Sequence, residues 1–495
     1  MYKLINILFL LLPLVGLSQK DTLAHLYAIG GIGIDKAEEI IATADGGYVV
    51  VGSTTSNTSG NTDVYLLKLD SQINVVWSWA MGGNNNDWGY AVKETFDKGF
   101  IIASTTNSFG VNGDYNARLI KTDSLGVIQW HNIYGGNDWD LVYDVVQTAD
   151  SGFAFCGETY NNTNGESDVY IVKTNSLGDT LWTKTIGGTL VDRGNSIMET
   201  TDSNIVVAGM KTTLTDSVQM YMIKLTVTGS LIWDIAFGPS GYEEANAVIE
   251  TANGNYVLGG VTTSFTPNND KDFYMIRTDS SGNAIWGNYF GQPGEEVIYD
   301  LVEDTQTNNI VATGFTKAVG GGQKDAVLFA VSSNAVWLNL GITFGGTKNE
   351  EAKSINFINN EYILAGSTNN FGNGLEDFLI IRLDTLLPGM DTTNTIVQDQ
   401  ITININELSK QNYSFDFELF PNPANQQFVS IRLPLLIENN LSLKVFDLSG
   451  SLVASSFFKT NTFLMDISSL DNGLYFIEIS NQENVKAIKK LMVIH

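Results

Sequence analysis

A tryptophan recurs at a nearly constant interval through most of this 495-residue chain. Successive copies lie 51 to 53 residues apart, at Trp77, Trp130, Trp182, Trp233, Trp286 and Trp337. A glycine opens each unit, and the seven leading glycines are Gly30, Gly82, Gly135, Gly187, Gly238, Gly291 and Gly345. Repeats of this length are typical of stacked units that cannot bury a core alone. The chain is therefore predicted to contain seven such units.

Each unit has the pattern of four short strands. In the first unit the expected strands are residues 37–44, 48–54, 63–69 and 75–80, with a tight turn at Asp45-Gly46-Gly47. Asp-Gly turns between runs rich in Val, Ile and Tyr are hairpin signals, and no stretch keeps a helical period. Four antiparallel strands repeated seven times predict an all-β fold, a seven-bladed β-propeller over residues 21–385.

The two ends of the repeat region are complementary. The seventh unit supplies only three strands, because Leu387-Pro388-Gly389 interrupts the pattern. Residues 23–29 form an extra strand before Gly30, with His25 at the position that tryptophan occupies in other units. We expect this N-terminal strand to complete the last blade and close the ring. The alternative is an open array in which residues 23–29 are disordered.

The repeat also carries a recognisable set of motifs. These are Gly-Gly followed by an acid, Thr-x-Asp-Gly-Gly-Tyr, Gly-x-Thr, Asp-x-Tyr-x-x-Lys and Asp-Ser-x-Gly before the tryptophan. The pattern resembles the seven-bladed bacterial propeller repeats related to delta-60 repeats. This resemblance implies the fold but no particular activity, because propellers host many functions.

The segments outside the repeats indicate export. Residues 1–18 begin Met1-Tyr2-Lys3, continue with an apolar run and end in Gly16-Leu17-Ser18, which predicts a secretory signal peptide. The apolar run is too short to favour the alternative, a membrane anchor, and no later segment reaches about 18 uninterrupted apolar residues. We therefore expect no transmembrane segment in the mature chain. Residues 386–414 are rich in Thr, Asn, Asp and Gln and are interpreted as a linker.

Residues 415–495 form a separate module of short alternating strands, which predicts a small Ig-like β-sandwich. It contains Pro421-Asn422-Pro423, then Leu-x-x-Gly-x-Tyr-Phe with Gly473 and Tyr475, then a basic final strand with Lys489 and Lys490. The order of these motifs resembles the type A sorting domain of type IX secretion in Bacteroidota. The resemblance implies partners in the outer-membrane secretion and sortase machinery, followed by release or attachment to lipopolysaccharide. The alternative is an unrelated Ig-like binding domain.

Composition narrows the possible functions. The formal charge of −27 argues against nucleic acid and anionic lipid as partners, because both require a basic surface. Three histidines and one cysteine leave little material for Ser-His-Asp or Cys-His catalysis, and phosphate-loop and zinc-protease motifs are absent from the sequence. We predict a non-enzymatic binding or adhesion module, outside the cell or on its surface after Sec export and type IX secretion. The alternative is an extracellular polysaccharide-degrading enzyme or a glycan-binding accessory protein.

An acid follows each leading glycine by five residues, and the seven acids are Asp35, Asp87, Asp140, Asp192, Glu243, Glu296 and Glu350. A second acid opens the third strand in five units, at Asp63, Asp168, Asp272, Asp325 and Asp377, with Asn116 and Gln219 in the other two. In one interpretation each of the seven acids caps its own turn. In the other, they form a ring at the channel mouth that binds a cationic ligand or a divalent cation, with Ca²⁺ as the candidate cofactor.

Three tryptophans, Trp79, Trp88 and Trp139, lie outside the repeat register, and the last two stand in the acid-bearing loop of consecutive units. Trp88 and Trp139 stand beside carboxylates and asparagines, so they are candidates for stacking on the sugars of a glycan, while the alternative is that they fill gaps between blades. An unidentified extracellular protein or glycan is the expected partner. Cys156 is interpreted as a small buried filler.

Overall fold

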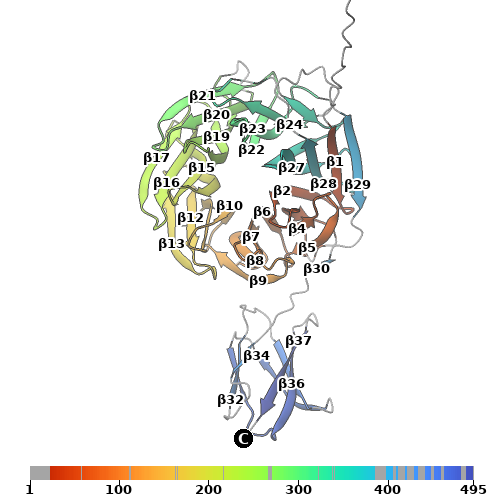
Figure 1. Ribbon diagram of the computed structural model, residues 1–495. Helices are drawn as coiled ribbons and strands as arrows, with labels where there is room; N and C mark the ends of the chain where they lie inside the picture. The colour runs from red at the N-terminus through yellow and green to blue at the C-terminus, as the bar shows by residue number, and fades with distance from the viewer. Residues whose placement is uncertain are drawn as a thin grey trace, which may run out of the picture.

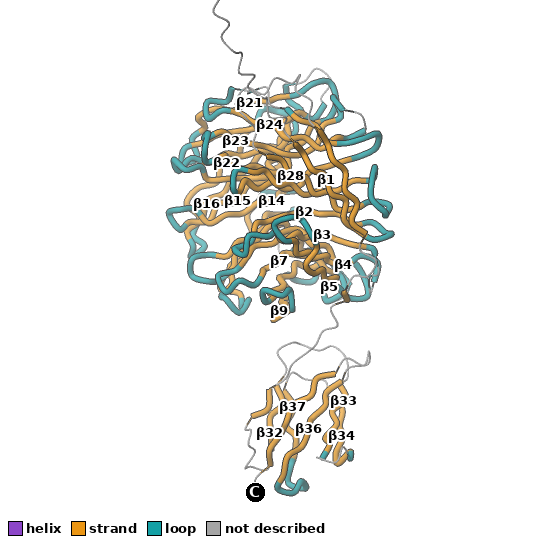
Figure 2. The backbone as a smooth tube through the Cα atoms, turned by 45° about the vertical axis from the view of Figure 1, so that its right-hand side comes forward, coloured by secondary structure: helices purple, strands orange, loops and turns teal. Residues whose placement is uncertain are grey.

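The computed structural model describes residues 23–384 apart from gaps at 57, 59, 111–112, 162, 164, 216, 266–269, 321–322, 337 and 339–340. Beyond these it describes 397–404, 409–410, 418–420, 428–432, 441–447, 451–458, 462–480 and 486–493. Figure 1 shows the first range as a ring of small sheets about a common axis, and the strands after residue 418 as a second, smaller body. All the regular elements in the described ranges are strands, as the tube in Figure 2 shows.

Seven antiparallel sheets make up the ring, and each inner strand begins at one of the seven repeat acids. The inner strands are β2 (Asp35–Ala42), β6 (Asp87–Glu94), β10 (Asp140–Gln147), β14 (Asp192–Glu199), β18 (Glu243–Glu250), β22 (Glu296–Asp304) and β26 (Glu350–Ile358). The second strands are β3 (Tyr48–Thr54), β7 (Phe100–Thr106), β11 (Phe153–Thr159), β15 (Asn204–Thr212), β19 (Tyr256–Thr262), β23 (Asn309–Thr316) and β27 (Glu361–Thr368).

The outer half of each sheet follows the same order. The third strands are β4 (Asp63–Leu69), β8 (Asn116–Thr122), β12 (Asp168–Thr174), β16 (Val218–Thr226), β20 (Asp272–Thr278), β24 (Asp325–Val331) and β28 (Asp377–Asp384). The fourth strands are β5 (Val75–Met81), β9 (Ile128–Tyr134), β13 (Thr180–Ile186), β17 (Leu231–Phe237), β21 (Ala284–Phe290), β25 (Ile342–Phe344) and, in the seventh sheet, β1 (Leu23–Gly30). The prediction of an all-β, seven-bladed propeller is confirmed.

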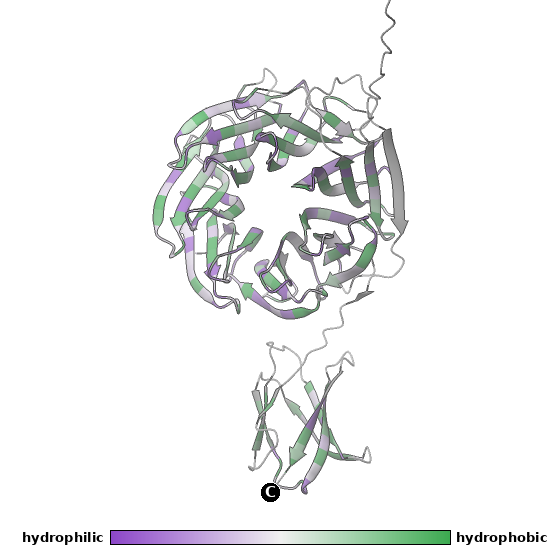
Figure 3. Ribbon diagram, in the orientation of Figure 1, coloured by the Kyte–Doolittle hydropathy of each residue, from purple (hydrophilic) through white to green (hydrophobic). Residues whose placement is uncertain are grey.

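The middle strands of each blade are buried on both faces because blades pack face to face. Every residue of β4, β8 and β12 is buried, whereas the fourth strand β17 is mostly exposed or half-buried. Figure 3 shows the corresponding change from apolar middle strands to a mixed outer strand. Strands covered on both sides need nearly continuous apolar runs, which is why β-branched residues dominate them.

The repeated tryptophans connect neighbouring blades. The Trp77 ring packs edge-on against Phe100 of the next blade, with ring centroids 6.1 Å apart, and the Trp130 ring packs against Phe153 in a tilted arrangement at 5.8 Å. The indole Nε1 of Trp182 donates to the Val227 carbonyl at 3.0 Å. At these three junctions one blade therefore presents a large aromatic surface to the next. The sixth copy, Trp337, lies outside the described residues.

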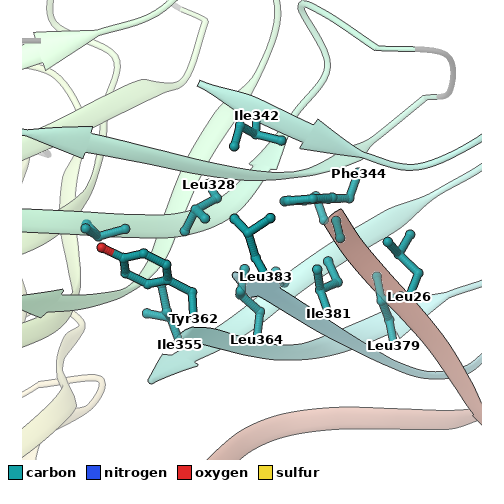
Figure 4. Close-up of a cluster of buried hydrophobic side chains, with 14 of the residues drawn as sticks. Leu26, Leu328, Ile342, Phe344, Ile355, Tyr362, Leu364, Leu379, Ile381 and Leu383 are labelled. Atoms are coloured by element: carbon teal, nitrogen blue, oxygen red, sulfur yellow. The ribbon is translucent and has the colours of Figure 1, made fainter. Parts of the chain in front are cut away.

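The N-terminal strand β1 lies beside β28, as the fourth strand of the seventh sheet. The antiparallel register pairs Leu26 with Ile381 and His25 with Arg382, as Trp77 pairs with Lys68 in the first blade. Leu26 is fully buried in the core cluster that includes Leu379 and Ile381, which Figure 4 shows at close range. The two ends of the propeller chain are thus joined by backbone pairing and side-chain packing.

Part of the predicted linker forms strands on the propeller. The segment β29 (Val397–Asn404) pairs in parallel with β1 along its whole length, and β30 (Ser409–Lys410) pairs in parallel with Trp79 and Ala80 of β5. Both segments cover the outer edges of the two blades that meet at the ring closure. The composition of residues 386–414 gave no sign of this, because the pairing partners lie at the far end of the chain.

The smaller body consists of two sheets. One contains β31 (Glu418–Phe420), β32 (Phe428–Arg432) and β35 (Thr462–Asp466); the other contains β34 (Leu452–Phe458), β33 (Leu441–Phe446), β36 (Gly473–Ser480) and β37 (Lys486–Val493). Alternate residues of both sheets point into one shared core, among them Val429, Val445 and Ile477. This is the arrangement of a small β-sandwich. In the described part of the whole chain, no helix is long and apolar enough to span a membrane.

Candidate functional site

The seven repeat acids are buried rather than exposed at a channel mouth. Each side chain is at most 2% exposed, and each lies at the first residue of an inner strand, one per blade around the ring. Because they are spread over seven blades, the structure does not bring them together at one place. Among the described residues, no group of three or more His, Cys, Asp or Glu side chains is placed to hold a metal ion.

The contacts of these acids are those of a turn cap. Asp35 Oδ2 accepts from the Gly31 amide at 2.7 Å and from the Ser56 hydroxyl at 3.0 Å, while Oδ1 accepts from Thr54. In four other blades the equivalent carboxylate accepts from the amide of the residue four positions before it, which is Gly83, Gly136, Gly188 or Gly346. A carboxylate that accepts several such bonds fixes the loop that enters the blade. Binding of a cation or cationic ligand by these acids stays a prediction.

Trp88 and Trp139 belong to a longer run of aromatic rings. The run comprises Trp88, Tyr115, Trp139 and Tyr160, and consecutive ring centroids lie 5.2, 5.3 and 6.0 Å apart. Trp139 is 45% exposed, and the other three rings are half-buried. We call these four residues the aromatic run. It extends over the second and third blades and presents a partly open aromatic surface to solvent.

Strand ends position the four rings. Trp88 is the second residue of β6, Trp139 directly precedes β10, Tyr115 directly precedes β8, and Tyr160 directly follows β11. The Asp140 amide donates to the Tyr115 carbonyl and the Tyr160 amide to the Trp139 carbonyl, both at 2.8 Å. The two tyrosines were missed in the sequence, although both flank strands at the same end of the blades as the tryptophans.

Amide side chains hold the loop that carries Trp139. Asn161 Oδ1 accepts from the amides of Asn137 and Asp138 at 2.9 and 3.1 Å, and its Nδ2 donates to Asp140 at 2.8 Å. The loop residues 135–139 are exposed. The exposed Trp139 ring therefore lies on a hydrogen-bonded loop beside polar side chains.

A network of charged side chains lines the inner strands. Lys93 forms ion pairs with Glu39 and with Asp144, the latter at 3.4 Å, and Arg193 pairs with Glu244 at 2.8 Å. Although burial acts in the opposite direction, the two neighbouring carboxylates raise the pKa of Lys93. The sequence did not single out these residues, because their proximity depends on which inner strands lie side by side in neighbouring blades.

Two side chains that could serve in nucleophilic catalysis, Cys156 and His131, are buried and have shifted pKa values. Burial raises the pKa of the Cys156 thiol, which keeps it protonated and inert. Burial, with the nearby charge of Arg118, lowers the pKa of His131 to about 3, so this imidazole remains neutral at physiological pH. Cys156 is fully buried in a hydrophobic cluster, as a small filler would be.

The recurring lysines of the third strands are structural. The Lys173 side chain is 1% exposed, and its Nζ donates to both oxygens of Asp150 and to the Thr174 carbonyl, each at 2.9 or 3.0 Å. Lys68 and Lys121 make equivalent ion pairs with Asp45 and Asp97, the aspartates of the Asp-x-Gly turns in their own blades. These lysines hold the turn between the first and second strands against the third strand.

The sorting-motif residues of the smaller body occupy its second sheet. Gly473 begins β36, Tyr475 packs into the core and donates from its hydroxyl to the Asp471 carbonyl at 3.0 Å, and Lys489 and Lys490 lie in β37. Pro421, Asn422 and Pro423 lie outside the described residues. A family model described as the secretion system C-terminal sorting domain matches residues 418–494.

Residues 418–494 form a secretion sorting domain. The sorting domain confirms the prediction of export by type IX secretion, to the cell surface or beyond it. It also implies an interaction with the type IX secretion machinery.

Solved structures similar to the chain are distant. The extracellular domain of a putative one-component system from B. thetaiotaomicron is 13% identical, with a TM-score of 0.42, covering 93% of this chain and 57% of the other. The WD40 β-propeller domain of Doa1 is 10% identical, with a TM-score of 0.46, covering 76% and 99%. PorZ, a surface component of the type IX secretion system of Porphyromonas gingivalis, is 13% identical, with a TM-score of 0.28, covering 95% and 70%.

The chain thus spans 57% of the length of the first of these proteins. No curated protein sequence matches it. At such scores the similarities carry no argument about function, and the fold assignment rests on the strand pairing described above.

Proposed function

We propose that the propeller is an extracellular binding module that recognises a glycan through the aromatic run. The observation that carries the proposal is the continuous set of four rings with Trp139 exposed at its surface. Pyranose rings present apolar C–H faces, and these faces stack on indole and phenol rings whose polar edges remain hydrated. The amides and carboxylates of the Asn137 and Asp138 loop supply hydrogen-bonding groups for the sugar hydroxyls.

Charge favours a neutral or cationic glycan. The chain carries a formal charge of −27, and Asp114, Asp138 and Glu158 lie next to ring residues in the sequence or one position further away. An acidic polysaccharide would be repelled by this field. We further propose that the protein leaves the cell by Sec export followed by type IX secretion, and that a surface sortase removes the sorting domain before release or attachment.

We propose that the module has no catalytic activity. The neutral His131, the buried Cys156 thiol and the involvement of the repeat acids in turn capping support this proposal. Glycoside hydrolysis would need two carboxyl groups flanking one bond of the substrate. The seven repeat acids are instead at most 2% exposed at the starts of their strands, where they cannot contact a glycosidic bond.

The test is affinity electrophoresis of the full chain through gels that contain soluble neutral polysaccharides: a β-glucan, a mannan or a xylan. Removal of the Trp139 ring (Trp139→Ala) should weaken retardation about tenfold, because one aromatic contact contributes about 1 kcal/mol or slightly more. The matched control is Tyr289→Ala, which removes an equally exposed ring from the outer strand of the fifth blade.

Equal loss in both variants, or no retardation of the wild-type chain by any of the polysaccharides, would refute glycan recognition by the aromatic run. The appearance of new reducing ends after incubation with the same polysaccharides would refute the absence of catalysis. Retardation that depends on Trp139 and not on Tyr289, without new reducing ends, is the expected result.

A further inference from the structure

Two polar side chains meet at every junction between consecutive blades. One is the repeat acid that begins an inner strand, and the other begins the third strand of the preceding blade. Five junctions pair two acids: Asp63 with Asp87, Asp168 with Asp192, Asp272 with Glu296, Asp325 with Glu350, and Asp377 with Asp35. All ten acids are at most 3% exposed. The other two junctions have an amide in the third strand, Asn116 before Asp140 and Gln219 before Glu243.

The leading glycine shows how close the two acids are. A Cβ atom on Gly187 would lie 2.0 Å from Asp168 Oδ1 and 2.7 Å from Asp192 Oδ2. A Cβ atom on Gly345 would lie 2.2 Å from Asp325 Oδ1 and 2.6 Å from Glu350 Oε2. Both carboxyl groups therefore border one small space, and the glycine is required because any side chain would occupy it.

The same relation holds at two further junctions. A Cβ on Gly30 would lie 2.1 Å from Asp377 Oδ1 and 2.7 Å from Asp35 Oδ2, and one on Gly82 would lie 2.1 Å from Asp63 Oδ1 and 2.9 Å from Asp87 Oδ2. At the fifth junction a Cβ on Gly291 would lie 2.2 Å from Asp272 Oδ1, and the Glu296 amide donates to the carbonyl of Lys271, the residue before Asp272, at 2.7 Å. Two carboxyl groups that meet in this way can hydrogen-bond to each other only if one of them carries a proton.

The charged groups around these pairs differ between junctions. Four of the pairs are faced by a cation or a tyrosine ring. Arg118 lies 3.5 Å from Asp87, and Lys348 faces Glu350. Lys211 and Tyr221 face the Asp168 and Asp192 pair, and Tyr65 faces Asp35. The Asp272 and Glu296 pair is faced by a third carboxylate, Asp270. The neighbouring Lys271 places its Nζ over the Tyr242 ring, 5.0 Å from the centroid. This junction therefore has the least compensation for two negative charges.

The two amide junctions indicate what the third-strand residue must do. Gln219 Nε2 donates to the carbonyl of the leading glycine Gly238 at 2.9 Å. A protonated carboxyl can donate in the same place, whereas an ionised carboxylate can only accept. An independent observation is that Glu296 Oε2 is buried without a protein donor among the described residues. A proton on its neighbour would satisfy this oxygen.

We propose that the blade junctions are proton-binding sites, and that at the Asp272 and Glu296 junction the two carboxyl groups share one proton at neutral pH. Two ionised carboxylates in a buried space repel each other and lose hydration, so the second ionisation is opposed by both effects. The proton converts the pair into a hydrogen-bonded contact between the fifth and sixth blades. The shared proton thus stabilises the packing of one blade on the next.

The direction of the pH dependence follows from linkage. Burial, with the repulsion of the Asp272 carboxyl, raises the pKa of Glu296 from 4.5 to about 7. Burial also raises the pKa values of Asp35, Asp192, Asp272, Glu350 and Asp377. A carboxyl group whose pKa is higher in the folded chain stabilises it fully below the unfolded pKa and loses that contribution as the pH rises through the folded pKa. At the Glu296 junction this window runs from 4.5 to about 7.

Two opposite substitutions in the full chain test the proposal. Glu296→Gln provides an amide donor that does not titrate, as Gln219 does naturally, and Asn116→Asp creates a sixth acid pair. Thermal unfolding is followed by tryptophan fluorescence, which reports only the propeller because all nine tryptophans precede residue 338. Each variant is compared with the wild-type chain at about pH 5, near the lower end of the titration window, and at about pH 8, above the window.

The Tm of Glu296→Gln relative to wild type should be about 3 °C higher at the upper pH than at the lower pH, and Asn116→Asp should show the opposite difference. A shift that is the same at both pH values in either variant overturns the proposal. Should either variant fail to fold, ¹³C NMR of the chain labelled at glutamate carboxyl carbons is recorded for wild type and for Glu39→Gln, because burial also raises the pKa of Glu39 to about 7. A Glu resonance that titrates near pH 7 in both chains supports the shared proton, and titration of every Glu below about pH 5 in Glu39→Gln refutes it.

Discussion

The strand β1 closes the ring without a covalent link, so weakening its packing should open the propeller at one defined place. Leu26, at the centre of β1, is fully buried against Leu379 and Ile381 of β28 and belongs to the same core cluster as Leu328 and Phe344. Replacement by alanine (Leu26→Ala) leaves a cavity at the seam. Leu328→Ala is the matched control, because Leu328 is equally buried in that cluster but lies in β24, inside a continuous blade.

The size of the effect follows from burial. A fully buried leucine replaced by alanine in a core costs about 3 kcal/mol, the sum of lost transfer free energy and the cavity left behind. If β1 detaches as a unit, Leu26→Ala lowers the free energy of that local opening by the same amount. Amides that exchange through this opening should then exchange about 100-fold faster. Leu328→Ala lowers global stability by a similar amount without favouring detachment of β1.

Native-state hydrogen exchange read by mass spectrometry measures this difference. Peptides that cover β1 and β28 should exchange much faster in Leu26→Ala than in Leu328→Ala, while peptides from the second and third blades should be alike in both variants. Acceleration of β1 to the same extent in both variants would show that the seam has no separate opening. Unchanged exchange of β1 in Leu26→Ala would refute the role of its packing in closure.

Two further predictions concern the contacts within each repeat. Gly187→Ala should lower the free energy of unfolding in urea by about 1–3 kcal/mol, because its Cβ would displace Asp168 and Asp192. Gly188→Ala is the control: its Cβ has only an ordinary contact at 3.6 Å, so the free energy of unfolding should change by about 0.5 kcal/mol or less. Lys173→Met should cost about 1–2 kcal/mol near neutral pH. Despite partial burial, hydrogen bonds from Thr148 and Lys173 lower the pKa of Asp150. The cost of Lys173→Met should therefore disappear as the pH falls below the ordinary aspartate pKa of 3.8. A cost that persists in acid would contradict the ion pair.

The repeat unit could be predicted from the sequence because the patterns that define it are local. The tryptophan spacing, the Asp-Gly turns and the alternation of apolar residues depend only on neighbours in the chain, and they predicted the seven blades and the strands within each unit. The extra strand at residues 23–29 was recognisable for the same reason, since it continues the register that ends at Gly30. The motifs of the sorting domain likewise lie within one stretch of sequence.

The surroundings of the site residues could not be read in this way. The repeat acids were visible as a pattern, but whether a loop carboxylate faces water depends on the glycine turn and hydroxyl groups that fold over it. Tyr115 and Tyr160 join Trp88 and Trp139 only because two blades stand side by side. Their alignment depends on distances between strands rather than on spacing in the sequence.

The sequence by itself determined the number of blades, the strands that compose them and the route of export, because each of these is encoded in short motifs repeated at regular intervals. Only the tertiary structure decided which acids are paired beneath the leading glycines and that β29 lies along β1. Contacts of this kind join residues from different blades or opposite ends of the chain. Their energies depend on burial and on the charge of the partner, which exist only once the ring has closed.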